Sequence, residues 1–157
     1  MIQFIEGDIR EATETYLCHQ CNCITTKAAH LAKDIFCAFP YANVYAIRTS
    51  KDNPGTIRIC GDGVHQRFVV NMFAQVYPGS PKYPNSDIDG SLARQKYFRS
   101  CLSELAKAIK PGDTVAFPWR IGCGAAGGDW NVYLYLISMF ADDIDSGVVV
   151  YRKGERN

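Results

Sequence analysis

Short apolar runs and longer amphipathic stretches alternate along this sequence. Short runs rich in Ile, Val, Phe and Tyr are typical of buried strands, whereas apolar positions three or four residues apart predict helices. The predicted strands are Ile2–Ile5, Tyr16–Cys23, Thr56–Cys60, Arg67–Phe73, Thr114–Phe117 and Gly147–Tyr151. The predicted helices are Ala28–Phe39, Ser91–Ile109 and Trp130–Ala141.

Turn residues separate these elements. Pro40 ends the first helix, and Thr25 or Thr26 is expected to cap its start. Gly61-Asp62-Gly63 links two strands as a hairpin, and the Pro- and Gly-containing residues 76–90 are expected to be an irregular surface loop. Strands that alternate with helices predict a layered α/β domain, to which the hairpin adds an antiparallel or mixed element.

Composition places the chain among ordinary globular domains. Its 157 residues fit one domain, and the apolar fraction of 47% is typical of a globular protein. A net charge of +1 gives no basic field that would favour nucleic acid. No run of eighteen apolar residues is present, and Met1–Phe4 lacks the features of a secretory leader, so we expect neither a membrane span nor secretion.

Seven cysteines, an odd number, lie mostly within apolar segments, which indicates buried free thiols. Free thiols are typical of a reducing compartment, so an intracellular location, cytoplasmic or nuclear, is expected. Cys18, Cys21 and Cys23 with His19 could suggest a metal cluster. However, the segment alternates like a strand and no second ligand pair follows at a regular spacing, so no metal site is expected.

A segment of small residues connects the strand that ends near Phe117 to the helix that begins at Trp130. It contains four glycines and two alanines, and such a loop lets backbone N–H groups approach an anion at a helix N-terminus. It matches neither the GxxxxGK[ST] phosphate loop nor the GxGxxG fingerprint. A tight turn that needs small residues for packing is the alternative. Asp8, Asn22, Gln75 and residues 120–128 all fall at predicted strand ends, where ligands bind in α/β sheets.

Four motifs in order along the chain resemble the macro domains, a family of ADP-ribose-binding α/β modules. They are Glu6–Ile9, Cys21–Cys23, Val70–Gln75 and Pro118–Trp130, and the resemblance covers nearly the whole chain. The branch most similar holds the yeast-type ADP-ribose 1″-phosphate phosphatases and the terminal ADP-ribose protein glycohydrolase. The resemblance implies a single domain, residues 1–157, with a three-layer α/β/α fold around a central mixed sheet.

The resemblance also implies roles for individual residues. Asp8 would accept a hydrogen bond from the adenine amine, with the Ile9 N–H facing the base, and Tyr151 could stack on adenine. Asn22 would contact the distal ribose or its leaving group. The alternatives are an N-cap or turn role for Asp8, a turn role for Asn22 and a core position for Tyr151. The diphosphate would lie on the backbone of Gly122, Cys123, Gly124, Ala125, Ala126 and Gly127.

Two features depart from the family pattern. Family members commonly carry a glycine-rich loop after the Asn, but residues 24–32 contain no glycine, and His30 stands about where glycine is expected. Either this loop is displaced, or Lys27 and His30 reach toward the ligand. The glycohydrolase branch uses a lysine nucleophile after the central strand, and residues 73–76 contain none. A lysyl-adduct mechanism is therefore disfavoured.

Hydrolysis of a 1″-linked group requires an activated water or nucleophile and stabilisation of the leaving oxygen. Asn22, His30 and Asp129 are the catalytic candidates. Asp129 could instead cap the helix that it precedes, and His30 could be a solvent-facing helical residue. His19 is expected to be a hydrogen-bonded core residue, and Arg120 either supplies positive charge at the loop or is solvated.

Two main hypotheses about function follow. The first is a hydrolase that acts on ADP-ribose 1″-phosphate or on ester-linked ADP-ribosyl groups, with ADP-ribose derivatives or mono-ADP-ribosylated protein as partners and no cofactor. The second is a reader module that binds ADP-ribose without reacting. Recognition of RNA or poly-ADP-ribose is a weaker third idea, because no basic stripe is visible.

Overall fold

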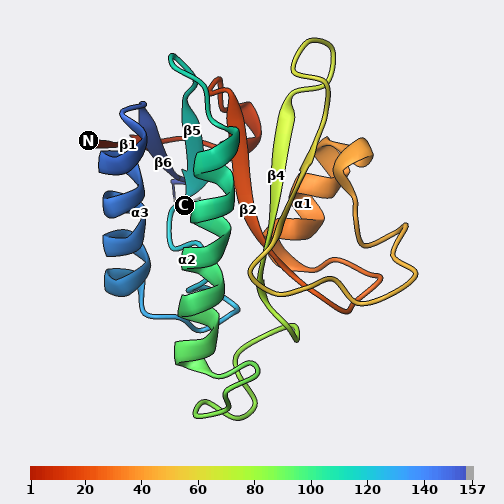
Figure 1. The fold of residues 1–157 in the computed structure, drawn as a ribbon. Helices are drawn as coiled ribbons and strands as arrows, with labels where there is room; N and C mark the ends of the chain where they lie inside the picture. The colour runs from red at the N-terminus through yellow and green to blue at the C-terminus, as the bar shows by residue number, and fades with distance from the viewer. Residues whose placement is uncertain (155–157) are drawn as a thin grey trace.

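The structure, a computed structural model, describes residues 1–154, so the last three residues of the predicted domain 1–157 lie outside the described residues. Its strands and helices alternate along the chain (Figure 1). The strands are β1 (Ile2–Glu6), β2 (Tyr16–Asn22), β3 (Ile57–Cys60), β4 (Phe68–Gln75), β5 (Val115–Pro118) and β6 (Val148–Arg152). The helices are α1 (His30–Ala38), α2 (Ser91–Ala108) and α3 (Trp130–Ile144), with 3-10 turns at Ile9–Glu11 and Pro40–Ala42.

One six-stranded sheet organises the fold, in the order β1-β6-β5-β2-β4-β3. β3 pairs antiparallel with β4, and every other neighbouring pair is parallel. The predicted hairpin and the predicted mixed sheet are therefore confirmed. Because the other strands are parallel, the carboxyl ends of β2, β4 and β5 meet at one edge of the sheet.

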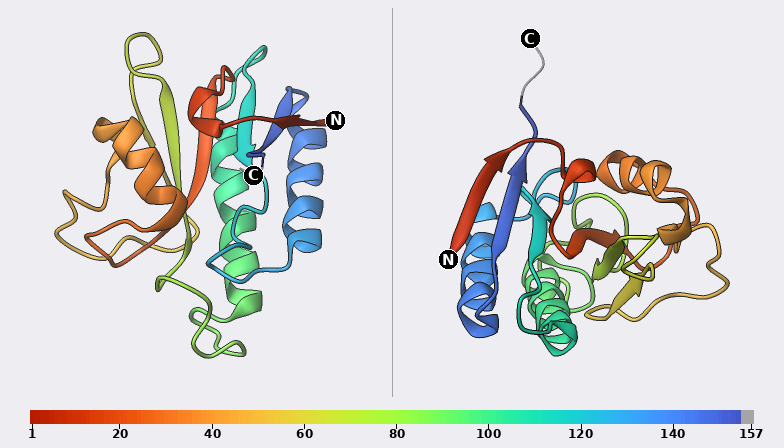
Figure 2. Two further views of the ribbon diagram at one scale, coloured as in Figure 1. Left: turned by 180° about the vertical axis from the view of Figure 1, so that it is seen from behind. Right: turned by 90° about the horizontal axis from the view of Figure 1, so that it is seen from above.

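Helices cover both faces of the sheet, as the three-layer prediction requires. α2 and α3 lie on one face and α1 lies on the other (Figures 1 and 2). Side chains alternate along β2: Cys18 packs in the core under α2 and α3, whereas Leu17 and Cys21 pack in the core under α1. Cys18 therefore lies on the opposite face of the sheet from Cys21 and Cys23.

The start of α1 differs from the prediction. The helix begins at His30 after Ala29, which makes no side-chain capping hydrogen bond. The expected cap at Thr25 or Thr26 is wrong, because the helix begins only at His30 and the Thr25 hydroxyl is engaged by the Asn22 side chain. α3 also continues three residues past the predicted end at Ala141.

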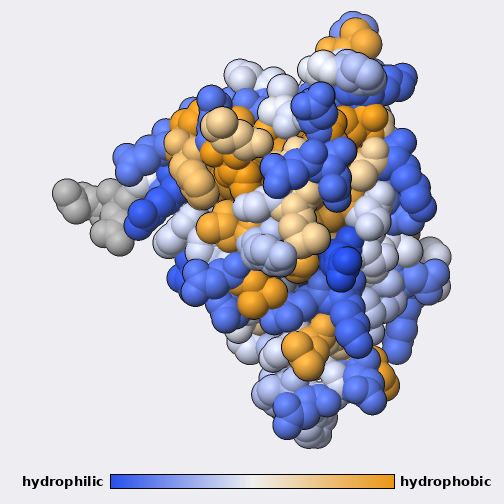
Figure 3. Space-filling view, turned by 60° about the vertical axis from the view of Figure 1, so that its left-hand side comes forward, coloured by the Kyte–Doolittle hydropathy of each residue, from blue (hydrophilic) through white to orange (hydrophobic). Residues whose placement is uncertain are grey.

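Apolar side chains remain exposed on the face that includes β1 and α3 (Figure 3). β1 is an edge strand, and Phe4 and Met139 are more than a third exposed there. No helix within residues 1–154 has both the length and the apolarity needed to cross a membrane.

Candidate functional site

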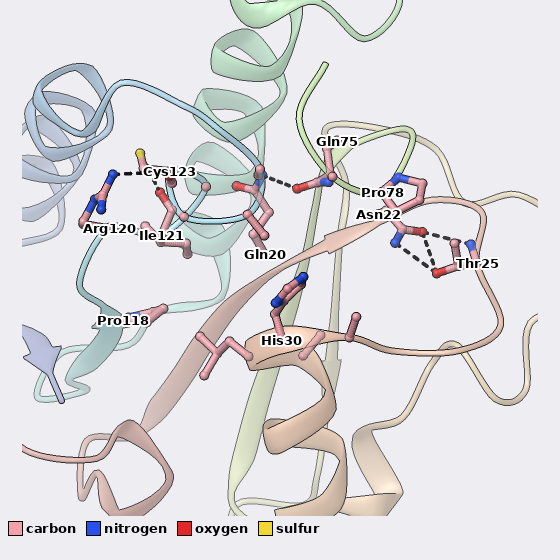
Figure 4. Close-up of a pocket in the computed structure, with 18 of the residues that line it drawn as sticks. Gln20, Asn22, Thr25, His30, Gln75, Pro78, Pro118, Arg120, Ile121 and Cys123 are labelled. Atoms are coloured by element: carbon pink, nitrogen blue, oxygen red, sulfur yellow. Dashed lines mark hydrogen bonds between the residues drawn. The ribbon is translucent and has the colours of Figure 1, made fainter. Parts of the chain in front are cut away.

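A pocket of about 450 Å³ opens at the carboxyl ends of β2, β4 and β5 (Figure 4). Its walls come from the β2–α1 loop with the start of α1, from the segment after β4, and from the loop between β5 and α3. This is the edge of an α/β sheet where ligands usually bind. The fold therefore concentrates the strand-end residues around one cavity.

The charged side chains that line this pocket are all basic. Lys27 and Arg120 line it, and His30 points toward Gln20 and Asn22 (Figure 4). Among the described residues that line the pocket, none is Asp or Glu. Such a lining favours an anionic ligand.

The β5–α3 loop exposes a row of backbone donors. The carbonyl groups of Cys123, Gly124 and Ala125 accept hydrogen bonds from the Arg120 side chain, the Gly127 N–H and the Ser80 hydroxyl. In a trans peptide the next N–H points opposite to the carbonyl. The N–H groups of residues 124, 125 and 126 therefore face the other way, and none of them donates to another group within residues 1–154.

The geometry of this loop depends on left-handed backbone at selected positions. Gly122 and Gly127 have φ values of 74° and 75°, and Arg120 has φ of 60°. A Cβ on Gly122 would lie 2.6 Å from the Tyr133 ring and 2.7 Å from Gln20 Oε1. Glycine at 122 is therefore required by both conformation and space. Three successive N–H groups in such a loop form an anion-binding concavity.

The structure brings together most of the residues predicted for the diphosphate and the catalytic site, but not all of them. Neither Gly127 nor the more distant candidates line the pocket. The predicted residues that do line it are Asn22, His30, Gly122, Cys123, Gly124, Ala125 and Ala126. Those outside its lining are Asp8, Ile9, Gly127, Asp129 and Tyr151.

Asp8 caps the 3-10 turn that contains the buried Ile9. Its carboxylate accepts hydrogen bonds from the backbone and guanidinium of Arg10, with Lys153 nearby at 3.8 Å. Hydrogen bonding to Arg10 is the main reason that the pKa of Asp8 is lowered to about 2. Tyr151 donates its hydroxyl hydrogen bond to Glu14 at 2.5 Å.

Asn22 holds the turn after β2. Its side-chain oxygen accepts from the N–H groups of Ile24 (3.0 Å) and Thr25 (2.9 Å), and its amide donates to the Thr25 hydroxyl. This is the turn role that such a strand-end Asn often has. Asn22 is at the same time part of the pocket wall.

His30 occupies the position where glycine was expected, and it adopts a glycine-like conformation with φ of 55°. Few non-glycine residues adopt this left-handed conformation. Both His30 and Lys27 line the pocket. Of the two alternatives for the glycine-free loop, the geometry thus fits the one in which these side chains face the ligand site.

Asp129 is exposed and lies at the N-cap of α3, where its carboxylate accepts from the Asn131 N–H at 3.0 Å. Cys123 lines the pocket, but burial raises the pKa of its thiol to about 12. Cys123 therefore stays protonated and is a poor nucleophile. His30 also lines the pocket, so its wall includes an imidazole as well as this thiol.

Sequence reasoning placed Gln75 at a strand end but missed Gln20, its partner in an amide pair that lines the pocket. Gln20 donates to Gln75 at 2.8 Å, and Gln75 donates in turn to the carbonyl of Tyr77 at the same distance. Alternation could have identified Gln20, since it lies two residues before Asn22 and shares its face of β2. His19, in contrast, is the buried, hydrogen-bonded residue that was predicted, bound to Asn71 at 2.6 Å.

Arg48 was also missed, because it lies in an irregular segment far from any motif. Its guanidinium donates to the carbonyls of Asn22 (2.8 Å) and Thr25 (2.9 Å) and pairs with Asp52. Nearby, the Tyr45 hydroxyl accepts from the Asn22 N–H at 2.7 Å. Within the described part of the chain, no group of three His, Cys, Asp or Glu side chains could hold a metal ion.

Comparison with known proteins identifies the fold. The macrodomain of Mycobacterium tuberculosis DarG has a TM-score of 0.74 and 22% identity, covering 98% of this chain and 99% of that one. The Thermus aquaticus DarG macrodomain has a TM-score of 0.70 and 21% identity, with 99% of both chains covered. A Trypanosoma brucei macrodomain in complex with ADP-ribose has a TM-score of 0.64 and 14% identity, covering 96% of this chain and 63% of that one.

No protein-family model matches the sequence, and no curated protein sequence matches it either. The structural likeness nevertheless covers nearly the whole chain. The chain therefore has the macrodomain fold.

Proposed function

We propose that this chain binds ADP-ribose, or a derivative linked at the 1″ position, with its diphosphate on the N–H groups of Gly124, Ala125 and Ala126. The observation that carries this proposal is the row of three N–H groups beside a pocket lined by cations and by no described carboxylate. The shared fold with a macrodomain in complex with ADP-ribose supports it. Gly122, Cys123 and Gly127 complete the loop around the diphosphate.

The adenine end of the ligand is proposed to extend toward Asp8, Ile9 and Tyr151. A carboxylate offers about four acceptor sites, so Asp8 can accept from the adenine amine while it stays paired with Arg10. This part of the proposal predicts that adenosine analogues without the exocyclic amine bind more weakly. The distal ribose would then lie toward Asn22 and His30, which line the other end of the loop-bounded pocket.

At that distal end we propose hydrolysis of the 1″ linkage. Water attacks the phosphorus of a 1″-phosphate, or the acyl carbon of an ester, and the ADP-ribose oxygen leaves with a proton. His30 is the proposed acid–base group, and Asn22 orients the distal ribose or leaving group. Lys27 and the uncapped N-terminus of α1 favour a negatively charged group at this end, so the 1″-phosphate is the preferred substrate.

Asp129 remains a second catalytic candidate that an isosteric variant can test. Asn is as good an N-cap as Asp, so Asp129→Asn keeps the cap and removes the carboxylate. Because Asp129 lies outside the pocket lining, we expect D129N to retain turnover within a few-fold. A large loss of turnover with unchanged stability would instead make Asp129 catalytic.

The experiment that tests the function follows ADP-ribose 1″-phosphate by phosphorus NMR, first with catalytic and then with stoichiometric protein. A growing inorganic phosphate signal, lost in His30→Ala, establishes the phosphatase. Shifted diphosphate signals without released phosphate leave a binder or a hydrolase of another linkage, such as an ADP-ribosyl ester on a protein. No change in any signal refutes the ADP-ribose proposal.

A reader module is the second candidate, and one observation favours it. The oxygen of the Asn22 side chain is occupied by its own turn, and Asp129 is exposed at a helix cap. Few catalytic groups therefore remain in the pocket. Tight ADP-ribose binding, with no product from 1″-phosphate or ester substrates, would support the reader.

A further inference from the structure

The segment that follows β4 lies against residues 122–127 of the β5–α3 loop, which the proposed function makes the anion-binding loop. Gly79 lines the pocket, and the Ser80 hydroxyl donates to the carbonyl of Ala125 at 3.2 Å. A Cβ on Gly127 would lie 2.7 Å from the same hydroxyl. Residues 77–80, the outer segment, thus contact the loop closely enough to require glycine there.

A buried ion pair holds the outer segment in place. Asp89 and Arg94 are 6% and 2% exposed, and they form a two-pronged pair with distances of 3.1 and 2.7 Å. The Asp89 carboxylate also accepts from the N–H groups of Val76 and Tyr77. Such paired, charge-assisted hydrogen bonds fix geometry strongly.

The remaining donors of Arg94 connect the two walls of the pocket. They reach the carbonyls of Tyr77 (3.1 Å) and Gly79 (2.6 Å) in the outer segment, and the carbonyl of Ala126 (3.3 Å) in the anion-binding loop. One guanidinium therefore ties the helix α2, the outer segment and the loop together. A lysine cannot replace it, because an ammonium lacks the planar fork and has fewer donors.

These contacts hold carbonyl groups of the loop, each on the opposite side of its peptide from the N–H group. Because Ser80 holds the carbonyl of Ala125, the trans peptide directs the N–H of Ala126 to the opposite side. Arg94 donates to the carbonyl of Ala126, which keeps the peptide between Ala126 and Gly127 from rotating. Neither Ser80 nor Arg94 lines the pocket.

We propose that Ser80 and Arg94 are positioning residues for anion binding, which orient the N–H groups of the loop without touching the ligand. The identity of the ligand as ADP-ribose rests on the proposed function, whereas the orientation of the N–H groups does not. The outer segment is then part of the binding machinery, although its sequence resembles an ordinary surface loop.

Three variants and two control substitutions test this proposal. Ser80→Ala removes the hydroxyl, and Ser80→Thr keeps it. Arg94→Lys keeps the charge but not the fork. Ser103→Ala and Arg99→Lys are the controls, since both residues are exposed on α2, the helix that carries Arg94.

Two readouts are measured for each variant: the affinity for ADP-ribose and for inorganic pyrophosphate, and the amide NMR shifts of residues 124–126 in the ligand-free protein. We expect S80A to weaken binding up to about tenfold, as for loss of one neutral hydrogen bond. R94K should weaken it by about 100-fold, as for a displaced binding group. The loop amide shifts should move in both, while S80T and the controls keep wild-type values.

The outcomes separate this proposal from the proposed function. If the wild-type protein binds no ADP-ribose, the proposed function fails. The amide NMR shifts of the loop and the affinity for pyrophosphate would still test the positioning role of Ser80 and Arg94. Variants that lower thermal stability but leave both the loop shifts and the affinities unchanged would show a purely structural role and overturn the proposal.

Discussion

The Arg48 guanidinium donates to both oxygens of Asn22, the backbone carbonyl at 2.8 Å and the side-chain oxygen at 3.4 Å. The Arg48 side chain is only 4% exposed, so these bonds form away from water. They hold the turn that follows β2. A buried cation therefore shapes the β2–α1 loop of this chain.

Removal of that cation should destabilise the fold. Arg48→Ala leaves the carbonyls of Asn22 and Thr25 without their donor, and we expect the free energy of unfolding to fall by about 2–3 kcal/mol. Chemical denaturation measures this loss. The exposed Arg58→Ala should change stability by less than about 0.5 kcal/mol, and equal effects of the two substitutions would contradict the role given to Arg48.

The left-handed backbone of His30 gives a second prediction. His30→Gly and His30→Ala both remove the imidazole, but only alanine keeps the cost of φ at 55°. We expect H30G to be more stable than H30A by about 1 kcal/mol in urea denaturation. Both variants should lose about 10²-fold or more in turnover, as expected for removal of an acid–base group.

The stabilities of H30G and H30A report on the backbone conformation at residue 30, and their turnover rates report on the imidazole. Equal stability of H30G and H30A would mean that the backbone at residue 30 relaxes in solution. Turnover retained in both would limit the imidazole to a place in the pocket wall.

Two glycines of the β5–α3 loop give a matched pair for a third prediction. Gly122→Ala meets Tyr133 and Gln20 at less than 3 Å with φ of 74°, whereas a Cβ on Gly124 meets nothing within 4 Å. We expect G122A to lower the free energy of unfolding by about 1–3 kcal/mol and to weaken ADP-ribose binding strongly. G124A should keep the wild-type stability. Melting experiments measure the stability of each variant, and calorimetric titration measures its binding of ADP-ribose. The reverse ranking would refute this description of the loop.

Much of the fold could be predicted because apolar periodicity determines it locally. β2 reads as a strand because its side chains alternate between two cores, and the antiparallel β3–β4 hairpin follows from the turn at Gly61–Gly63. The β5–α3 loop is recognisable from its small residues between a strand and a helix. In each case the signal lies within one contiguous stretch of sequence.

The parts that could not be predicted depend on contacts between distant segments. Arg48 is 26 residues from Asn22, and Arg94 is 32 residues from Ala126. No local pattern distinguishes such arginines from solvated ones, since their partners are backbone carbonyls that any residue supplies. The position of Asp129 outside the pocket lining likewise depends on how α3 leaves the loop, which spacing alone does not specify.

His19 lies in the core under α1, fully buried against the edge of Phe36. Its Nε2 lies 2.6 Å from the Asn71 side-chain oxygen, and the Asn71 amide donates to the carbonyl of Arg58. This orientation makes Asn71 an acceptor toward the histidine, so the neutral ring donates to it. Burial lowers the pKa of His19 to about 4, because the charged ring would lose its hydration.

Stability should consequently fall as the solution is acidified. Between the unfolded pKa of about 6.5 and the folded pKa of about 4, the unfolded chain binds more protons than the folded one, so acid favours unfolding. Full stability is present above about pH 6.5, and about 2–3 kcal/mol should be lost by pH 4.5 in urea denaturation. His19→Gln keeps a donor for Asn71 and should flatten this slope, whereas His65→Gln, at an exposed site, should retain it. An unchanged slope in H19Q would assign the acid sensitivity to other groups.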